Sequence, residues 1–129
     1  MRVNKTRLFA KFARRERISD AALVEAIARA HRGLLDADLG GGLIEQRVAR
    51  QGGGRSGGYR TLIAVRFGAR AVFLFGFANN DRDNVSEDEL AELRVTARSW
   101  LAAGKVLIER ALEDGALIEV EYDGANQNG

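Results

Sequence analysis

Two neighbouring segments, residues 59–67 and 71–77, carry apolar side chains on both faces of an expected strand and are separated by a short turn at Gly68. Apolar residues on both faces indicate burial on both faces, and a short turn between two such strands predicts an antiparallel hairpin. We therefore expect this hairpin to form the centre of a β-sheet, with other parts of the chain covering each side.

Other segments also have the pattern of strands. Residues 3–9 read as a short strand, residues 43–50 alternate between apolar and polar positions, and residues 117–122 could add an edge strand. The glycine-rich segment 51–58 connects the second of these to the central hairpin. We expect a small antiparallel sheet of mostly three to four strands, built on the central hairpin.

Helical signals lie on either side of these strands. Ser19 is a good N-cap for a helix that runs to about Leu34 with apolar residues at the 3.6-residue period, and a short basic helix or turn precedes it. Residues 86–89 (Ser-Glu-Asp-Glu) form a capping box that begins a second long helix, and a further helix is expected over 105–114. The sequence thus predicts an α+β fold, with N-terminal helices packed on one face of the sheet and a C-terminal helical segment.

The length of 129 residues fits one domain, which we expect over residues 1–123, followed by an unstructured tail at 124–129. The chain has no Cys and one His, which argues against disulfides, thiolate metal sites and multi-histidine metal sites. We therefore expect no metal and no cofactor. No apolar run approaches the roughly 20 residues that span a bilayer, and the first 17 residues lack the apolar stretch of a signal peptide. A cytoplasmic protein with no membrane contact is expected.

Charge is divided unevenly along the chain. Residues 1–82 contain 16 Lys and Arg against 7 Asp and Glu, whereas residues 83–129 contain 4 against 11. Of the 20 basic residues, 17 are Arg, whose planar group of five donors matches phosphate oxygens in pairs. A basic part of this kind attracts polyanions, so the chain is expected to contact nucleic acid.

Five segments occur together in a characteristic order and spacing. They are residues 5–13 (KTRLFAKFA), 40–42 (GGG), 47–50 (RVAR), 55–61 (RSGGYRT) and 76–84 (GFANNDRDN). With the expected order of elements, they resemble the RelE/ParE superfamily of bacterial toxins, and the RelE-type, HigB-like branch in particular, over about residues 4–122.

This resemblance implies a RelE-like fold and a toxin of a type II toxin–antitoxin system. The implied activity is growth arrest and inhibition of translation by an endoribonuclease that cuts mRNA on the ribosome. The implied reaction is metal-independent, because the ribose 2′-hydroxyl attacks the neighbouring phosphate while the enzyme supplies positive charge and proton transfer. The implied partners are the ribosome, mRNA and a cognate antitoxin of the helix-turn-helix type.

The resemblance also implies a set of site residues. Arg60 is the leading catalytic candidate, since it matches the arginine of the family's Gly-Tyr-Arg motif and lies at the start of a strand of the central hairpin. The alternative for Arg60 is a structural arginine paired with Asp81 or Glu45. The remaining candidates are Arg82 and Arg55 as catalytic residues and Arg47, Arg50, Tyr59 and Asn80 as RNA-binding residues. For Arg47, Arg50 and Arg55 the alternative is a solvated surface arginine, and for Tyr59 it is a partly buried strand aromatic.

The chain departs from the family pattern at three positions. Asn80 stands where RelE-type ribonucleases carry a second catalytic arginine, Ser86 stands where they carry a tyrosine, and Asn79 replaces a common lysine. Arg82 could take over phosphate binding, and Ser86 has a structural role as a helix cap. These departures keep two other functions open: a non-catalytic toxin of the ParE type that binds DNA gyrase, and a degenerate toxin that only binds antitoxin or RNA.

Overall fold

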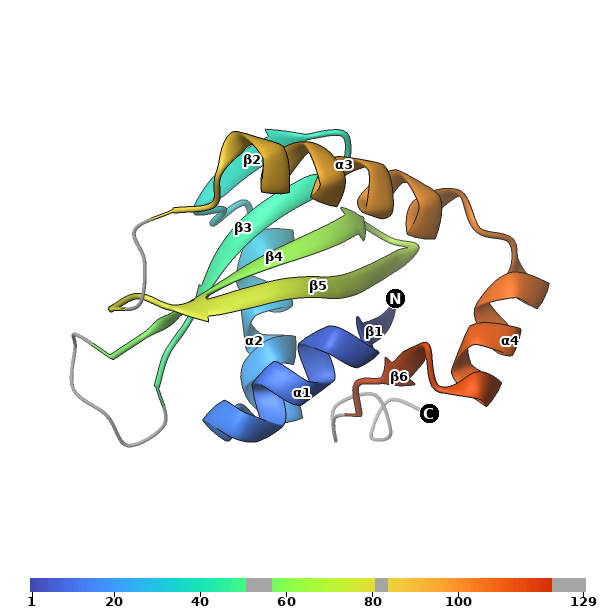
Figure 1. Cartoon of the computed structure of the whole chain (residues 1–129), viewed down its shortest axis with the longest axis horizontal. Helices are drawn as coiled ribbons and strands as arrows, with labels where there is room; N and C mark the ends of the chain where they lie inside the picture. Colours follow the sequence, from blue (N-terminus) through green and yellow to red (C-terminus); the bar gives the residue numbers. More distant parts are fainter. Residues whose placement is uncertain (51–56, 81–83, 122–129) are drawn as a thin grey trace.

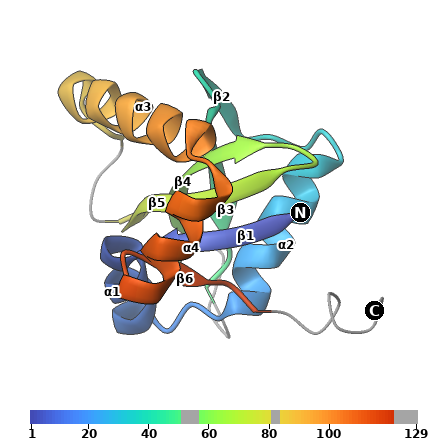
Figure 2. The same cartoon turned by 90° about the vertical axis from the view of Figure 1, so that its right-hand side faces the viewer.

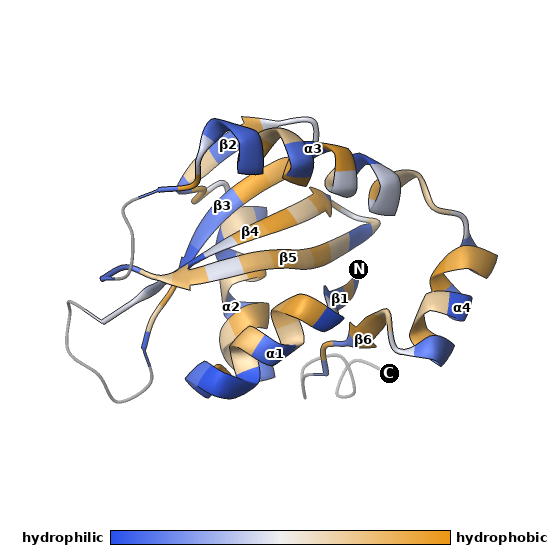
Figure 3. Cartoon of the chain, viewed as in Figure 1, coloured by the Kyte–Doolittle hydropathy of each residue, from blue (hydrophilic) through white to orange (hydrophobic). Residues whose placement is uncertain are grey.

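The computed structural model describes residues 1–50, 57–80 and 84–121 (Figure 1). Within them the elements follow the order β1 (Arg2–Thr6), α1 (Arg7–Glu16), α2 (Asp20–His31), β2 (Ala37–Gly40), β3 (Leu43–Val48), β4 (Tyr59–Arg66), β5 (Arg70–Ala78), α3 (Glu87–Ala102), α4 (Lys105–Asp114) and β6 (Leu117–Glu119). The strands form one sheet in the order β2-β3-β4-β5-β1-β6. The hairpin β4–β5 therefore lies at its centre, as its two apolar faces predict (Figure 3).

The sheet is larger and more mixed than expected. It has six strands in the described residues, and β1 runs parallel to β5, so the prediction of a three- to four-stranded antiparallel sheet is wrong in size and in strand direction. β2 falls at residues 37–40, where no strand was expected, whereas β1 and β6 fall on the segments 3–9 and 117–122 that carry a strand pattern. β1 pairs with segments far away along the chain, namely Arg2 with Arg70 and Asn4 with Glu119. A local alternation pattern contains no information about such distant partners.

The helix starts agree with the sequence signals, whereas α2 ends at His31, three residues before the expected end at about Leu34. Ser19 caps α2 by accepting a hydrogen bond from the N–H of Ala22 at 3.1 Å. Ser86 and Glu89 form both hydrogen bonds of the capping box at the start of α3. The predicted strand at 3–9 is shorter than expected, because the Thr6 hydroxyl accepts from the N–H of Phe9 and begins α1 there.

Helices cover both faces of the sheet. Phe9, Leu23 and Ile27 from α1 and α2 pack with Ile63 and Phe73 on one face. Ala97, Leu101 and Ile108 from α3 and α4 pack with Leu62 and Leu74 on the other. Figure 2 shows α3 at the top of the view and α1 and α2 in its lower part, with the strands between them. The predicted position of the N-terminal helices on one face of the sheet is therefore confirmed. None of the helices in the described ranges is long and apolar enough to cross a membrane.

The C-terminal end of α3 is held by two arginines of the central hairpin. Arg70 donates from one nitrogen to the carbonyl oxygens of Trp100 and Ala103 at 2.6 and 2.7 Å, and Arg66 donates to that of Leu101 at 3.2 Å. The last turn of α3 contains no basic residue of its own. These arginines therefore provide the positive charge that stabilises the carbonyl end of a helix.

Gly76 on β5 allows α1 to approach the sheet closely. A Cβ atom built at Gly76 would lie 2.5 Å from Cε2 of Phe12 and 3.1 Å from Cε1 of Phe9. We therefore expect Gly76→Ala to lower the free energy of unfolding by about 1–3 kcal/mol through overpacking. Urea denaturation would measure this, and Gly104→Ala is the control because nothing lies within 4 Å of a Cβ at that position. Equal stability of the two variants would contradict the expectation.

Candidate functional site

Two of the predicted site residues, Arg47 and Arg60, lie side by side near one end of the neighbouring strands β3 and β4. They are direct partners in the antiparallel register of β3 and β4. Residues directly opposite in such a register point to the same face, and here that face is the one that also carries Leu62 beneath α3. Like charges in this position repel each other. A negative charge close to the two arginines would offset this repulsion.

Glu45 provides such a charge from within the protein. It precedes Arg47 by two residues on β3, and its Oε2 lies 3.6 Å from Nε of Arg60. Both side chains are largely buried, with 23% of Arg60 and 12% of Glu45 exposed. The ion pair with Glu45 that the sequence offered as the alternative for Arg60 is therefore present, whereas Asp81 lies outside the described residues. The ion pair therefore holds Arg60 near Glu45, on the face of the sheet that Arg47 also occupies.

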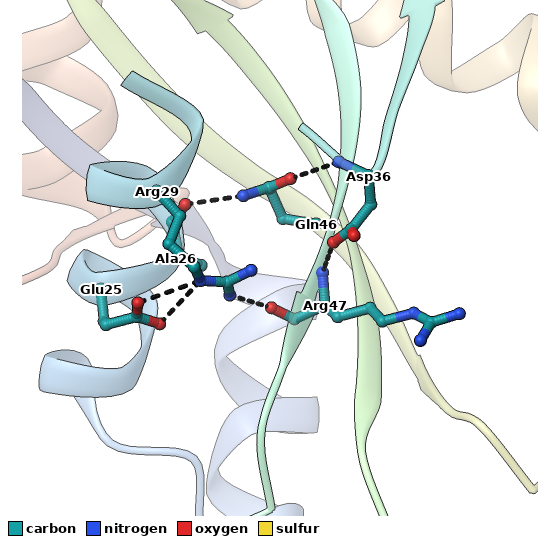
Figure 4. Close-up of polar contacts among 6 residues, drawn as sticks. All are labelled: Glu25, Ala26, Arg29, Asp36, Gln46 and Arg47. Carbon is teal, nitrogen blue, oxygen red and sulfur yellow. Dashed lines mark hydrogen bonds and ion pairs between the residues drawn. The ribbon is translucent and has the colours of Figure 1, made fainter. Parts of the chain in front are cut away.

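The backbone at Arg47 is anchored by polar contacts on the opposite side of β3 (Figure 4). The buried Gln46 donates to the carbonyl oxygen of Ala26 at 2.9 Å and accepts from the N–H of Asp36 at 2.8 Å. The N–H of Arg47 donates to the Asp36 carboxylate at 2.7 Å, and the carbonyl of Arg47 accepts from Arg29. Figure 4 shows the side chain of Arg47 extending away from Gln46 and Arg29. A rigid strand thus positions an exposed guanidinium.

Tyr59 and Arg50 lie away from the arginine pair. Tyr59 precedes Arg60 on β4 and points to the opposite face, where it is only 3% exposed and packs edge-on against Phe12. Its hydroxyl donates to the carbonyl oxygen of Glu16 at 3.3 Å. The guanidinium carbon of Arg50 lies 5.7 Å from the centre of the Tyr59 ring. This position supports the alternative of a buried strand aromatic for Tyr59, and the structure does not bring it together with Arg60.

The remaining candidates fall on the connections at this end of the sheet. Asn80 is exposed and lies two residues beyond the end of β5. It is close to the start of β4, because the N–H of the preceding Asn79 donates to the carbonyl of Gly58 at 3.0 Å. Arg55 and Arg82 lie outside the described residues. Ser86 is occupied as the cap of α3, which is the structural role expected for it.

The arrangement that results is a pair of arginines on one face of the sheet, with a carboxylate beside one of them. Arg47 and Arg60 can donate to the oxygens of one phosphate group, since each presents several N–H donors in a plane. Glu45 can accept a proton on the same face of the sheet. In the sequence analysis Glu45 is only a possible structural partner of Arg60. Its burial was not predicted, because the polar positions of an alternating strand are expected to face solvent. Its diagonal position to Arg60 follows only once the β3–β4 register is known.

Comparison with protein families gives one match. A family model described as the RelE toxin of the RelE / RelB toxin–antitoxin system matches residues 1–120, a range that includes every described helix and strand. A comparison with curated proteins found no match.

Proposed function

Since the chain belongs to the RelE toxin family of toxin–antitoxin systems, we propose that it arrests growth by cleaving mRNA on the ribosome. Membership of the family implies a cognate antitoxin as partner. The finer assignments, to the HigB-like branch, to endoribonuclease activity and to a helix-turn-helix antitoxin, are part of this proposal.

The observation that supports the proposal best is the pairing of Arg47 and Arg60 in register on adjacent strands. In the proposed reaction, the 2′-oxygen of a ribose forms a bond to the adjacent phosphorus and the bond from phosphorus to the 5′-oxygen breaks. The two guanidinium groups stabilise the negative charge that develops on the phosphate oxygens. Positioned in advance on rigid strands, they do so without reorganising during the reaction.

Proton transfer completes this scheme. The 2′-hydroxyl must lose a proton and the departing 5′-oxygen must gain one. Glu45 is a candidate proton acceptor, because its carboxylate lies beside Arg60 on the same face of the sheet. We further propose that Arg55, Arg82, Arg50 and Asn80 contact the RNA on either side of the cleaved bond, from the segments that adjoin this end of the sheet.

Induced expression in bacteria tests the proposal. We expect growth to stop and translated transcripts to be cut within codons, while transcripts without a ribosome-binding site stay intact, because the proposed substrate is mRNA on the ribosome. Mapping of 5′ ends by primer extension measures both. Growth arrest with intact transcripts would overturn the proposed activity.

A second candidate is a toxin of the ParE type that inhibits DNA gyrase without catalysis. The observations that favour it are Asn80 at the position where RelE-type ribonucleases carry an arginine and the use of Ser86 as a helix cap. Both leave a chain with the RelE fold but fewer groups for proton transfer. A supercoiling assay with purified gyrase separates the two functions, since inhibition supports the second candidate and an unaffected enzyme rules it out.

A further inference from the structure

Three arginines stand in a row across the sheet at the end opposite Arg60. Arg66 on β4 is the register partner of Arg70 on β5, and Arg70 is in turn the parallel partner of Arg2 on β1. Figure 1 places this end beside the N-terminus and α4, away from the end where β4 begins. Adjacent like charges on one face of a sheet repel each other. As for the pair Arg47–Arg60, a nearby negative charge would offset this repulsion.

The partners of this row offset its charge only in part. Arg66 and Arg70 donate to main-chain carbonyl oxygens at the end of α3, and these oxygens carry no full charge. Arg2 lies 3.8 Å from a carboxylate oxygen of Glu119, and the two side chains are 50% and 54% exposed. An ion pair as exposed as this contributes little, because water screens it. The row therefore retains net positive charge.

A hollow of about 240 Å³ opens beside these arginines. Arg2, Asn4, Ala69, Arg70, Lys105 and Ile108 line it, and none of these carries a carboxylate. Lys105 is the first residue of α4, whose N-cap Gly104 provides no side-chain hydrogen bond and whose first turn contains no acidic residue. The positive end of the α4 dipole therefore adds to the charge around the hollow.

Asn4 gives the hollow a second and independent property. The residue is 1% exposed, and its Oδ1 has no hydrogen-bond partner in the part of the chain that the structure describes. A buried acceptor without a donor costs stability, so native proteins usually supply a partner. Asn4 lies on the same face as Arg2, because the two residues are two positions apart on one strand. A ligand that suits this site therefore carries negative charge and also one hydrogen-bond donor.

We propose that this hollow binds hydrogen phosphate, with its oxygens toward Arg2, Arg70 and Lys105 and its hydroxyl donating to Oδ1 of Asn4. The volume of about 240 Å³ is below the usual range of small-molecule pockets, roughly 300–1,000 Å³, so a free ion fits better than a nucleotide. The site lies at the other end of the sheet from Arg60, and the proposal does not depend on ribonuclease activity.

Calorimetric titration of the full chain at constant ionic strength tests the site. Inorganic phosphate and sulfate are the probes, because hydrogen phosphate carries a hydroxyl donor and sulfate does not. We expect phosphate to bind about tenfold more tightly than sulfate, the effect of one hydrogen bond of about 1.4 kcal/mol. Equal binding of the two ions would overturn the proposal and indicate a non-specific cationic surface. Tighter binding of ribose 5-phosphate than of inorganic phosphate would overturn the assignment to a free ion.

Substitutions of residues that line the hollow test whether phosphate binds there. We expect Asn4→Leu to weaken phosphate binding about tenfold and to leave sulfate unchanged, since only phosphate donates to Oδ1. Lys105→Gln should weaken both ions, and Lys11→Gln, an equal charge loss at an exposed position of α1, should weaken neither. If Asn4→Leu does not fold, a difference between the two lysine variants still supports the site and its absence overturns it. The same series with Arg60→Ala removes any phosphate bound at Arg47 and Arg60.

Discussion

Replacing Arg60 with alanine is expected to relieve growth arrest and to slow mRNA cleavage by about 10²- to 10³-fold, as removal of one preorganised donor to a developing oxyanion usually does. Arg60 lies opposite Arg47 on a central strand, and its Nε lies 3.6 Å from Glu45, so in the proposed mechanism its guanidinium is in place before substrate arrives. Arg60→Lys keeps the charge but loses the planar set of donors, and an intermediate loss is expected. Cleavage of a reporter transcript in a cell-free translation reaction measures all three proteins.

The matched control is Arg98→Ala, which removes one exposed arginine from α3. It should retain full cleavage. Arg60→Ala also leaves the largely buried Glu45 without its ion-pair partner, and this can destabilise the fold. Circular dichroism and urea denaturation of the Arg60→Ala protein separate lost activity from lost structure. A folded Arg60→Ala protein that cleaves as fast as the Arg98→Ala protein would remove the arginine pair from the mechanism.

Replacing Phe9 with alanine is expected to lower the free energy of unfolding by about 3–5 kcal/mol, the usual cost of deleting a buried phenyl ring. Phe9 is fully buried between the sheet and α1, with its ring centre 5.1 Å from that of Phe73 and 5.7 Å from that of Phe12. Small domains have a total stability of only about 5–15 kcal/mol, so this single change removes a large part of it. Urea denaturation followed by circular dichroism measures the difference.

Leu8 provides the matched control for Phe9. It is the preceding residue on α1 and is 64% exposed, so Leu8→Ala should change stability by less than about 0.5 kcal/mol. Comparable losses in the two variants would mean that α1 does not pack through Phe9.

Much of the fold can be predicted from the sequence because its signals are local. The capping box at 86–89 fixes the start of α3, Ser19 fixes that of α2, and the two-sided apolar pattern of 59–67 and 71–77 identifies the centre of the sheet. In each case the side chains that determine the structure lie within a few residues of the position they determine.

The features that could not be predicted depend on contacts between distant segments. Three features follow from strand order and register. They are the parallel pairing of β1 with β5, the formation of the edge strand β2 and the burial of Glu45. The same holds for the candidate site. The Gly-Tyr-Arg motif identifies Arg60, but only the register of β3 and β4 places Arg47 beside it, and only the alternation of side chains along β4 turns Tyr59 to the other face.

The position of β1 between β5 and β6 has a consequence for synthesis of the protein. β1 can pair with β6 only after Glu119, the register partner of Asn4, has been translated. Until then a newly made chain presents β1 as an open edge with unpaired main-chain groups, a surface that readily joins other extended peptides. The sheet therefore gains its last strand only after β6 has been translated, which delays completion of the fold relative to assembly of its central hairpin.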